Sequence, residues 1–186
     1  YLKTINNTED SSNYSPYNRS IVRWNAFLND TITLGSFSIT PGVRFDHTRS
    51  SGDQYSYSLG ATWQALDTTI VRAYAARGYG VPKFISIDKP SEKIVTTQIG
   101  IESTAVPYLW LKGTLFRNET WGTDVERHKA LGAEAELRTI PLFNTSLGAG
   151  YTFVDTTRGD GTQVNYAARH TAKLSLRYDD KTHRAL

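Results

Sequence analysis

Two acidic residues, Glu134 and Glu136, have the type and spacing that come closest to catalytic chemistry in this sequence. Residues two apart on an extended strand share a face, with their Cα atoms about 6–7 Å apart. Carboxylate pairs at similar distances can hydrolyse glycosidic bonds. However, Arg138, Lys173 and Arg177 can pair with them, so a charged polar wall explains both glutamates more simply. We interpret four other charged residues in the same way: Arg44, Asp46, Arg72 and Glu102.

The other reactive residue types are too scattered to form a catalytic or metal site. The chain has no cysteine, which excludes disulfides, thiolate ligands and cysteine nucleophiles. There is no G-x-S-x-G motif, and the lone Gly78-Tyr79-Gly80 is not followed by a helical pattern. The four histidines lack metal-ligand spacing: His47, His128, His170 and His183. We therefore expect no catalytic residues, no metal site and no cofactor.

Aromatic and cationic side chains gather instead in the long polar connections of the chain. Such a set can bind an anionic, ring-bearing metal chelate through cation–π contacts and charge-assisted hydrogen bonds. The alternative is a hydrated loop rim whose aromatic residues lie at a membrane interface. The candidate ligand-binding residues are Tyr79, Lys83, Phe84, Trp121, Arg127, His128, Tyr166 and Arg169.

The segments that position these residues alternate with period 2. From Tyr55 to Ala65, large or apolar residues at odd positions alternate with Ser, Gly, Thr and Gln at even positions. This alternation is typical of a strand with one apolar and one polar face. We predict about nine consecutive strands without helices between them. They centre on residues 22–28, 37–45, 55–65, 71–75, 95–101, 109–115, 131–137, 147–153 and 172–178.

The connections between the predicted strands alternate in length. Four have the composition of tight turns: residues 34–36, 66–68, 106–108 and 141–144. Four others are longer or more polar: residues 49–54, 79–92, 121–127 and 158–169. Residues 1–19, rich in Asn, Ser and Tyr, resemble the end of another long loop. Short turns at one end and long loops at the other predict an antiparallel up-and-down sheet with two unlike rims.

Four features favour a transmembrane β-barrel over a soluble β-sandwich or barrel, which remains the alternative. Several strands reach the roughly 9–11 residues that a tilted strand needs to cross a bilayer. Glycines recur on the polar face, as expected where another domain approaches closely. Aromatic residues lie near strand ends, as in interfacial girdles, and the two rims differ as periplasmic turns and extracellular loops do. The net charge of +3 is dispersed, which disfavours nucleic-acid binding.

Several strand sequences resemble the barrel of TonB-dependent outer-membrane receptors. "SITPGVRFDH" (Ser38 to His47) is similar to their thr-pro-gly-hydrophobic-arg-tyr-asp strand, and "TTIVRAYAARGYGVP" (Thr68 to Pro82) to their strand that enters an arg-gly-aromatic loop. "KPSEKIVTTQIGIE" (Lys89 to Glu102) resembles the next loop and strand, but Ser91 interrupts its pro-glu pair and Gln98 replaces the usual Glu. The later strands "LKGTLFRNE", "ALGAEAELR", "SLGAGYTFVD" and "ARHTAKLSLRY" fit in order. The resemblance covers roughly Ile21 to Tyr178.

The resemblance implies an all-β, antiparallel, up-and-down transmembrane barrel, present only in part. Such receptors have roughly 22 strands around a plugged lumen, so this chain would be a later part of the barrel wall. We expect residues 1–19 to end an extracellular loop, residues 20–179 to form strands and loops, and residues 180–186 to form a truncated periplasmic turn. We expect these 186 residues to contain neither a plug domain nor a C-terminal strand that ends in an aromatic residue.

The resemblance also implies a function without chemistry of its own. A receptor of this kind lies in the bacterial outer membrane, encloses its own plug domain, and works with the TonB energy-coupling complex through that plug. Its small-molecule ligand would be a ferric siderophore or similar metal chelate, with haem, cobalamin and oligosaccharide left open. A passive porin or adhesin barrel, or a barrel enzyme, is the alternative. Its surroundings would be outer-membrane lipid, and no nucleic acid is expected.

Overall fold

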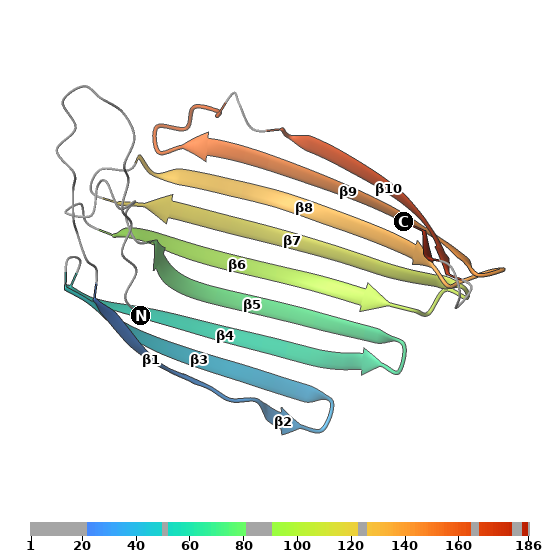
Figure 1. Ribbon diagram of the computed structural model, residues 1–186, viewed down its shortest axis with the longest axis horizontal. Coiled ribbons are helices and arrows are strands. Elements are labelled where there is room, and N and C mark those ends of the chain that lie inside the picture. Colours follow the sequence, from blue (N-terminus) through green and yellow to red (C-terminus); the bar gives the residue numbers. More distant parts are fainter. Residues whose placement is uncertain are drawn as a thin grey trace.

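The computed structural model describes residues 22–49, 52–80, 91–122, 126–164, 168–179 and 184–185, which form one antiparallel sheet. Strands that follow one another in the sequence lie side by side, so the sheet has up-and-down topology (Figure 1). No helix of the described residues is long and apolar enough to cross a membrane. The strands are β1 (Arg23–Asn29), β2 (Ile32–Leu34), β3 (Phe37–Thr48), β4 (Gly52–Leu66), β5 (Thr69–Gly80), β6 (Glu92–Ser103), β7 (Leu109–Trp121), β8 (His128–Thr139), β9 (Thr145–Arg158), β10 (His170–Asp179) and β11 (Arg184–Ala185).

The first two strands act as one interrupted strand, because both pair with β3. The break at Asp30 and Thr31 lies opposite Pro41 and Thr40 of β3. Proline has no N–H to donate to a neighbouring strand, so Asp30 and Pro41 share only the bond from the Asp30 N–H to the Pro41 carbonyl, at 3.4 Å. With β1 and β2 counted together and the two-residue β11 set aside, nine long strands remain. The predicted order and number of strands are therefore confirmed.

The two rims of the sheet differ as the sequence predicted. The short-turn rim comprises residues 35–36, 67–68, 104–108 and 140–144, and the other, which we call the long-loop rim, carries the connections at 49–51, 81–91, 122–127 and 159–169 (Figure 1). At the turn from β8 to β9, Phe143 and Asn144 both have positive φ, between the mutually hydrogen-bonded Leu142 and Thr145. Two consecutive residues with positive φ are typical of a type I′ turn, whose twist matches the twist of the two strands of a hairpin.

One turn of the long-loop rim is held by an acidic side chain. Asp160 accepts hydrogen bonds from the backbone N–H and the hydroxyl of Thr162, at 2.8 and 2.7 Å. These bonds, the backbone one first, lower the pKa of Asp160 below its usual value. Gly161 follows with φ +86°, a conformation that favours glycine. The connection between β9 and β10 therefore begins as an ordered turn.

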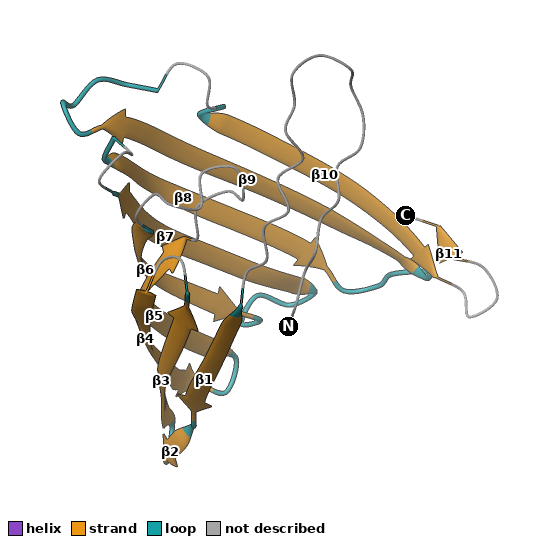
Figure 2. Ribbon diagram, turned by 60° about the vertical axis from the view of Figure 1, so that its left-hand side comes forward, coloured by secondary structure: helices purple, strands orange, loops and turns teal. Residues whose placement is uncertain are grey.

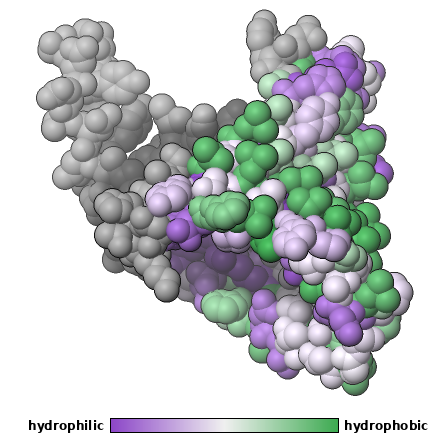
Figure 3. Space-filling view, turned by 90° about the vertical axis from the view of Figure 1, so that its right-hand side faces the viewer, coloured by the Kyte–Doolittle hydropathy of each residue, from purple (hydrophilic) through white to green (hydrophobic). Residues whose placement is uncertain are grey.

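The sheet is curved and open (Figure 2), and its pairing register gives it one polar and one apolar face. Register joins Ile99, Leu115, Ala133 and Phe153 into one apolar row across β6 to β9. The row shifted by one residue is polar: Gly100, Thr114, Glu134 and Thr152. Seen along the strands from the short-turn rim, hydrophilic residues line the recess and hydrophobic ones lie along the outer flank (Figure 3). We call these the concave and the convex face.

Exposure follows the faces in the opposite sense to a soluble protein. Leu115, Leu131 and Leu174 of the convex face are 59, 61 and 83% exposed. Among the residues that the structure describes, the two side chains that are almost fully buried, Asp46 and Thr48, are both polar. Because water does not favour such an apolar surface, the convex face requires a non-aqueous surrounding. The open, up-and-down sheet agrees with the predicted partial transmembrane barrel.

The sequence analysis also predicted the structure of the two ends of the chain. Residues 1–19, expected to end an extracellular loop, lie outside the described residues. Of residues 180–186, expected to form a periplasmic turn, the structure describes only Arg184 and Ala185. These two form β11, which pairs with Asp179 and Tyr178 of β10.

Candidate functional site

A buried carboxylate is the centre of a charged cluster on the concave face, near the long-loop rim. Asp46 is 1% exposed and accepts hydrogen bonds from two arginines. Arg23 of β1 donates from Nη2 at 2.8 Å, and Arg44, two residues away on the same face of β3, donates from Nε at 2.7 Å. Both guanidinium groups remain partly exposed. The cluster therefore compensates its buried charge and still presents cationic groups to the concave side.

Tyr79, one of the candidate ligand residues, belongs to this cluster. Nη2 of Arg23 donates to its hydroxyl at 2.7 Å, and the guanidinium lies 5.8 Å from its ring. The two residues come from β1 and β5, which are separated in the sheet by β3 and β4. The last part of β5 curves away from the line of β4 (Figure 1), and there the hydroxyl of Tyr79 meets Arg23. Tyr79 is therefore positioned by an arginine that the sequence did not single out.

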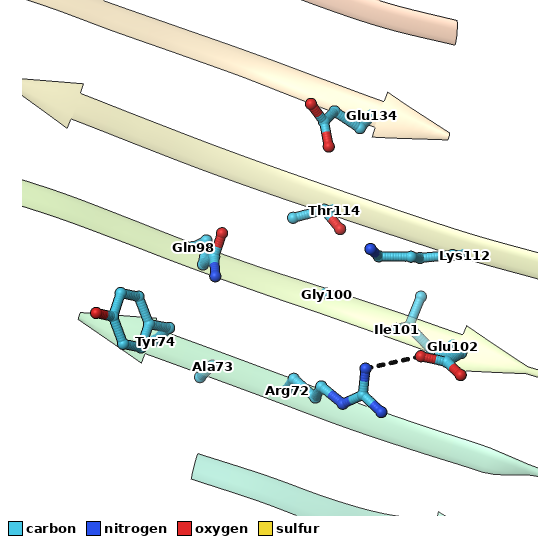
Figure 4. Close-up of a pocket in the computed structure, with 10 residues that line it drawn as sticks. All are labelled: Arg72, Ala73, Tyr74, Gln98, Gly100, Ile101, Glu102, Lys112, Thr114 and Glu134. Carbon is cyan, nitrogen blue, oxygen red and sulfur yellow. Dashed lines mark hydrogen bonds and ion pairs between the residues drawn. The ribbon is translucent and has the colours of Figure 1, made fainter. Parts of the chain in front are cut away.

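A polar pocket of about 190 Å³ lies on the concave face, farther from the long-loop rim (Figure 4). Arg72 donates to Glu102 at 2.7 Å, and Nε1 of Trp110 donates to the same carboxylate at 2.9 Å. Lys112 and Glu134 also line the pocket, and neither has an ion-pair partner within the described residues. A wall that carries uncompensated charges of both signs is suited to contact with a further polar surface.

The carboxylate pair that resembled a catalytic site is part of this wall. Nε of Arg138 donates to Glu136 at 2.8 Å, as the interpretation of paired charges predicted. Glu134, by contrast, stays unpaired within the described residues. The described residues contain no group of three or more His, Asp or Glu side chains that could hold a metal ion. What these residues can do is bind and orient charged groups.

Trp121 and Arg127, both candidate ligand residues, lie together, but on the convex face. Arg127 donates to Glu119 at 2.6 Å and lies 6.0 Å from the ring of Trp121. Arg117 forms a second ion pair with Glu119. Glu119 and Trp121 lie two and three pairs of residues along β7 from Leu115 at alternate positions, so all three side chains belong to the convex face. These two of the eight candidates are therefore neighbours, and the pleat of the strand decides which way they point.

Arg169 is also directed to the convex side. Its Nη2 lies 2.8 Å from Asp155, and its guanidinium lies 5.8 Å from the ring of Phe153, both in convex rows. His128 differs, because its register partner Arg158 shares the parity of the polar row. Both lie near Glu126, with Arg158 Nε 3.4 Å and His128 Nε2 4.0 Å from its carboxylate.

The eight candidate ligand residues thus do not form one cluster. Tyr79 and His128 lie on the concave side, while Trp121, Arg127 and Arg169 face the convex side. The remaining three lie outside the described residues: Lys83, Phe84 and Tyr166.

Sequence reasoning did not select two cations of the concave rim, Arg23 and Arg158. The sequence contained a signal for both, because each lies at one of the alternate positions of its strand that belong to the polar face. Choosing candidates by parity as well as by residue type would have included both and excluded Trp121, but it would also have excluded Tyr79, which shares the register position of Lys93 and Trp121.

Comparison with known proteins places this sheet in a family. The model for the TonB dependent receptor-like β-barrel matches residues 2–184. No curated protein sequence matches the chain. The family is an outer-membrane transporter and receptor family of Gram-negative bacteria.

Solved structures share the fold at low sequence identity. The chain superposes on the ferric enterobactin receptor of Pseudomonas aeruginosa with a TM-score of 0.78 and 17% identity, over 93% of this chain and 32% of that one. For the E. coli ferric-catecholate import receptor the values are 0.72, 16%, 92% and 35%. For the ferric citrate transporter in its unliganded form they are 0.68, 19%, 97% and 35%. The chain spans about a third of the length of these structures, and by its matching family model it belongs to the TonB-dependent receptor β-barrels.

Proposed function

We propose that this chain forms part of the barrel wall of an energy-coupled outer-membrane transporter for a ferric siderophore or a similar anionic metal chelate. The solved structures that share its fold are receptors and transporters of ferric enterobactin, ferric catecholates and ferric citrate. The observation that carries the proposal is the contrast between the faces: an apolar convex face suited to lipid and a charged concave wall. In this role the chain performs no catalysis.

The concave wall would contact the plug domain of the complete receptor. Lys112 and Glu134 line the central pocket without ion-pair partners among the described residues. An uncompensated charge is favourable only if water or a partner of opposite charge reaches it. We propose that polar groups of the plug do so here, and that the TonB complex acts on the barrel only through that plug.

The ligand would approach the concave part of the long-loop rim. Arg23, Arg44, Arg158 and His128 present cationic or titratable groups there, beside the aromatic Tyr79. Guanidinium groups bind anionic oxygen ligands through charge-assisted hydrogen bonds, and aromatic rings stack on ring-bearing chelates. We keep Lys83, Phe84 and Tyr166 as candidates for this site. Trp121, Arg127 and Arg169 are directed away from it.

Transport by the complete receptor tests the proposal. A strain that lacks the receptor gene is complemented with it and given one ferric chelate as its sole iron source. In parallel arms, haem replaces the ferric chelate as the iron source, or cobalamin is supplied to cells that require it for growth. Uptake of a ferric chelate that stops when the TonB complex is inactivated is the expected result. Uptake that continues without energy coupling would instead identify a passive porin-type barrel.

Ligand binding by two double variants tests the location of the site. His128→Ala with Arg158→Ala changes the concave rim, and Trp121→Ala with Arg127→Ala changes the convex side. We expect only the first double variant to weaken binding, by about tenfold or more, since each charge-assisted hydrogen bond contributes about 1.5–3 kcal/mol. Unchanged affinity in the concave variant, with loss in the convex one, would place the ligand on the other side of the rim.

A further inference from the structure

The ladder between β4 and β5 stops short of the long-loop rim. The last register pair of these two strands is Tyr57 with Arg77. Beyond that pair, residues 52–56 of β4 are paired only with β3, and residues 78–80 of β5 only with β6, within the described part of the chain. The end of β5 curves away from β4 at this level (Figure 1). We call this interruption of the pairing the β4–β5 seam.

One side chain at the seam lies on the side opposite to the one that its register predicts. Tyr79 shares the register position of Lys93 and Trp121, which belong to the convex face. Its hydroxyl nevertheless accepts a hydrogen bond from Nη2 of Arg23 at 2.7 Å, on the concave side. If β4 and β5 paired to their ends in the same register, Tyr79 would lie opposite Tyr55 on the convex face. Because one ring cannot point to both faces, the bond to Arg23 and the completed ladder exclude each other.

The backbone around Tyr79 can adopt both arrangements. A glycine precedes it and another follows it, and glycine adopts more backbone conformations than other residues. A Cβ on Gly78 would meet only the hydroxyl of Ser56, at 3.8 Å, so packing does not require a glycine there. On the convex face, Tyr55 is 54% exposed and its ring centroid lies 5.0 Å from that of Phe45. The ring of Tyr79 would extend this aromatic row in the completed ladder.

The hydrogen bond that keeps the seam open can be displaced from the concave side. Nη2 of Arg23 donates to Tyr79 and also to Asp46, at 2.8 Å. The side chain of Arg23 is 35% exposed, and that of the neighbouring Arg44 is 45% exposed. A carboxylate or catecholate oxygen is charged and can bind a guanidinium through two N–H groups, whereas the tyrosine hydroxyl is neutral and accepts from one. An anionic chelate at this rim would therefore compete with Tyr79 for Arg23.

We propose that Arg23 and Tyr79 form a latch that keeps the β4–β5 seam open until an anionic ligand binds. The ligand takes the N–H group of Arg23, the ring of Tyr79 turns to the convex face beside Tyr55, and the ladder pairs to its end. A ligand shifts such an equilibrium only through its different affinity for the two arrangements, and the released N–H group supplies that difference. The identity of the ligand rests on the proposed function. The two arrangements of the seam do not, because Tyr79→Phe changes their balance without any ligand.

A pair of cysteines that meet only in the completed ladder reports the state of the seam in the complete receptor. Gln54 and Gly80 would be register partners there, and a disulfide requires Cα atoms within about 7 Å. The measurement is the fraction of Gln54→Cys with Gly80→Cys that crosslinks during a short pulse of oxidant. Ser58→Cys with Ala76→Cys is the matched control, because these residues are already partners on the same face and should crosslink under every condition.

Adding Tyr79→Phe is expected to raise the ratio of the paired to the open seam about tenfold without ligand, which corresponds to about 1.4 kcal/mol. The phenyl ring keeps its place beside Tyr55 but can no longer accept the bond from Arg23. Unchanged crosslinking of the seam pair would overturn the proposal, as would an equal rise in the control pair. If Tyr79→Phe does not fold, Arg23→Lys replaces it, since one ammonium group does not reproduce the planar fork that holds both Asp46 and Tyr79.

The second arm adds a ligand to the receptor that retains Tyr79 and carries the seam pair. Iron(III) citrate and an iron(III) tris-catecholate are the probes, and their binding is measured separately by calorimetry. A probe that binds should raise crosslinking of the seam pair and leave the control pair unchanged. A probe that binds without this rise would overturn the coupling. If neither probe binds, the proposed function fails for these chelates, and the Tyr79→Phe arm still decides whether the latch exists.

Discussion

At the scale of single residues, this sheet buries charge and exposes hydrocarbon. Asp46 is almost inaccessible, whereas leucines of the convex face are mostly exposed. Burying a carboxylate is costly unless cations and hydrogen bonds compensate it. Arg23, Arg44 and the nearby hydroxyl of Tyr79 supply that compensation, and they join three strands that are not all neighbours. The network therefore braces the concave rim across the sheet.

The substitution Asp46→Asn is expected to destabilise the complete receptor by about 2 kcal/mol. It removes the buried charge that balances Arg23 and Arg44, and the partial exposure of both arginines limits the cost. The free energy of unfolding in detergent measures the effect. Asp53→Asn is the control, because Asp53 pairs with His47 at 2.6 Å in an exposed position, where such pairs contribute about 0–1 kcal/mol. Equal effects of the two substitutions would contradict the bracing role.

Gly132 is required by close packing on the concave face. A Cβ at this position would overlap Cζ of Phe116 and lie 2.5 Å from the carbonyl oxygen of Phe153. We expect Gly132→Ala to lower the free energy of unfolding by about 1–3 kcal/mol, the usual cost of overpacking. In Gly150→Ala the nearest atom, the carbonyl oxygen of Ala135, is 3.9 Å away. The midpoint of denaturation should therefore shift for the first variant only, and a tolerated Gly132→Ala would show that both Phe116 and the backbone at Phe153 can shift.

At the scale of the strand, alternation decides which environment each side chain meets. A shift of one residue exchanges the two faces, so the register is fixed wherever one face must be apolar. The register keeps Ile99, Leu115 and Ala133 together on the convex side. The break between β1 and β2, opposite Pro41 of β3, does not disturb this pattern, because β1 and β2 keep the same register with β3.

Leu115→Arg should destabilise the complete receptor in phospholipid vesicles by about 2–4 kcal/mol, the cost of Arg near the bilayer midplane on a lipid-facing strand. Leu115 is in the middle of β7 and is exposed on the convex face. Leu115→Phe keeps the position apolar and is expected to change stability by less than about 1.5 kcal/mol. Urea unfolding in vesicles compares the two. A neutral Leu115→Arg would mean that this face does not meet lipid.

At the scale of the whole molecule, the described strands form an open sheet. β1 pairs only with β3, and β10 pairs with β11 over two residues, so each end of the sheet has backbone groups without strand partners among the described residues. Hydrocarbon cannot hydrogen-bond such groups, and only closed barrels cross a bilayer as sheets. The matched structures are about three times longer than this chain, which is consistent with closure by strands outside it.

The polypeptide 1–186 on its own is therefore expected not to fold stably in detergent or lipid. Refolding into detergent micelles should give aggregates or a polydisperse species, without a heat-dependent shift on gel electrophoresis. The complete receptor, refolded by the same procedure, is the control and should show that shift. A monodisperse, heat-resistant species of the isolated chain would show that the sheet can close by itself.

The sequence by itself determined the strands, their order, the two unlike rims and the family. These features follow from local patterns: period-2 alternation from Tyr55 to Ala65 and turn residues such as Asn144. It also grouped Trp121 with Arg127 and Arg138 with Glu136, because neighbours along a hairpin or two apart on a strand are close in any pairing.

Only the tertiary structure decided which side of the wall each rim residue serves. Near strand ends the local pattern is too short to fix parity, and residues such as Arg127 and Arg169 precede the first paired position of their strands. The partnership of Arg23 with Tyr79 also depends on how the sheet curves, since β3 and β4 lie between their strands. Curvature and side-chain direction arise from the packing of all strands together, so no single segment of sequence contains them.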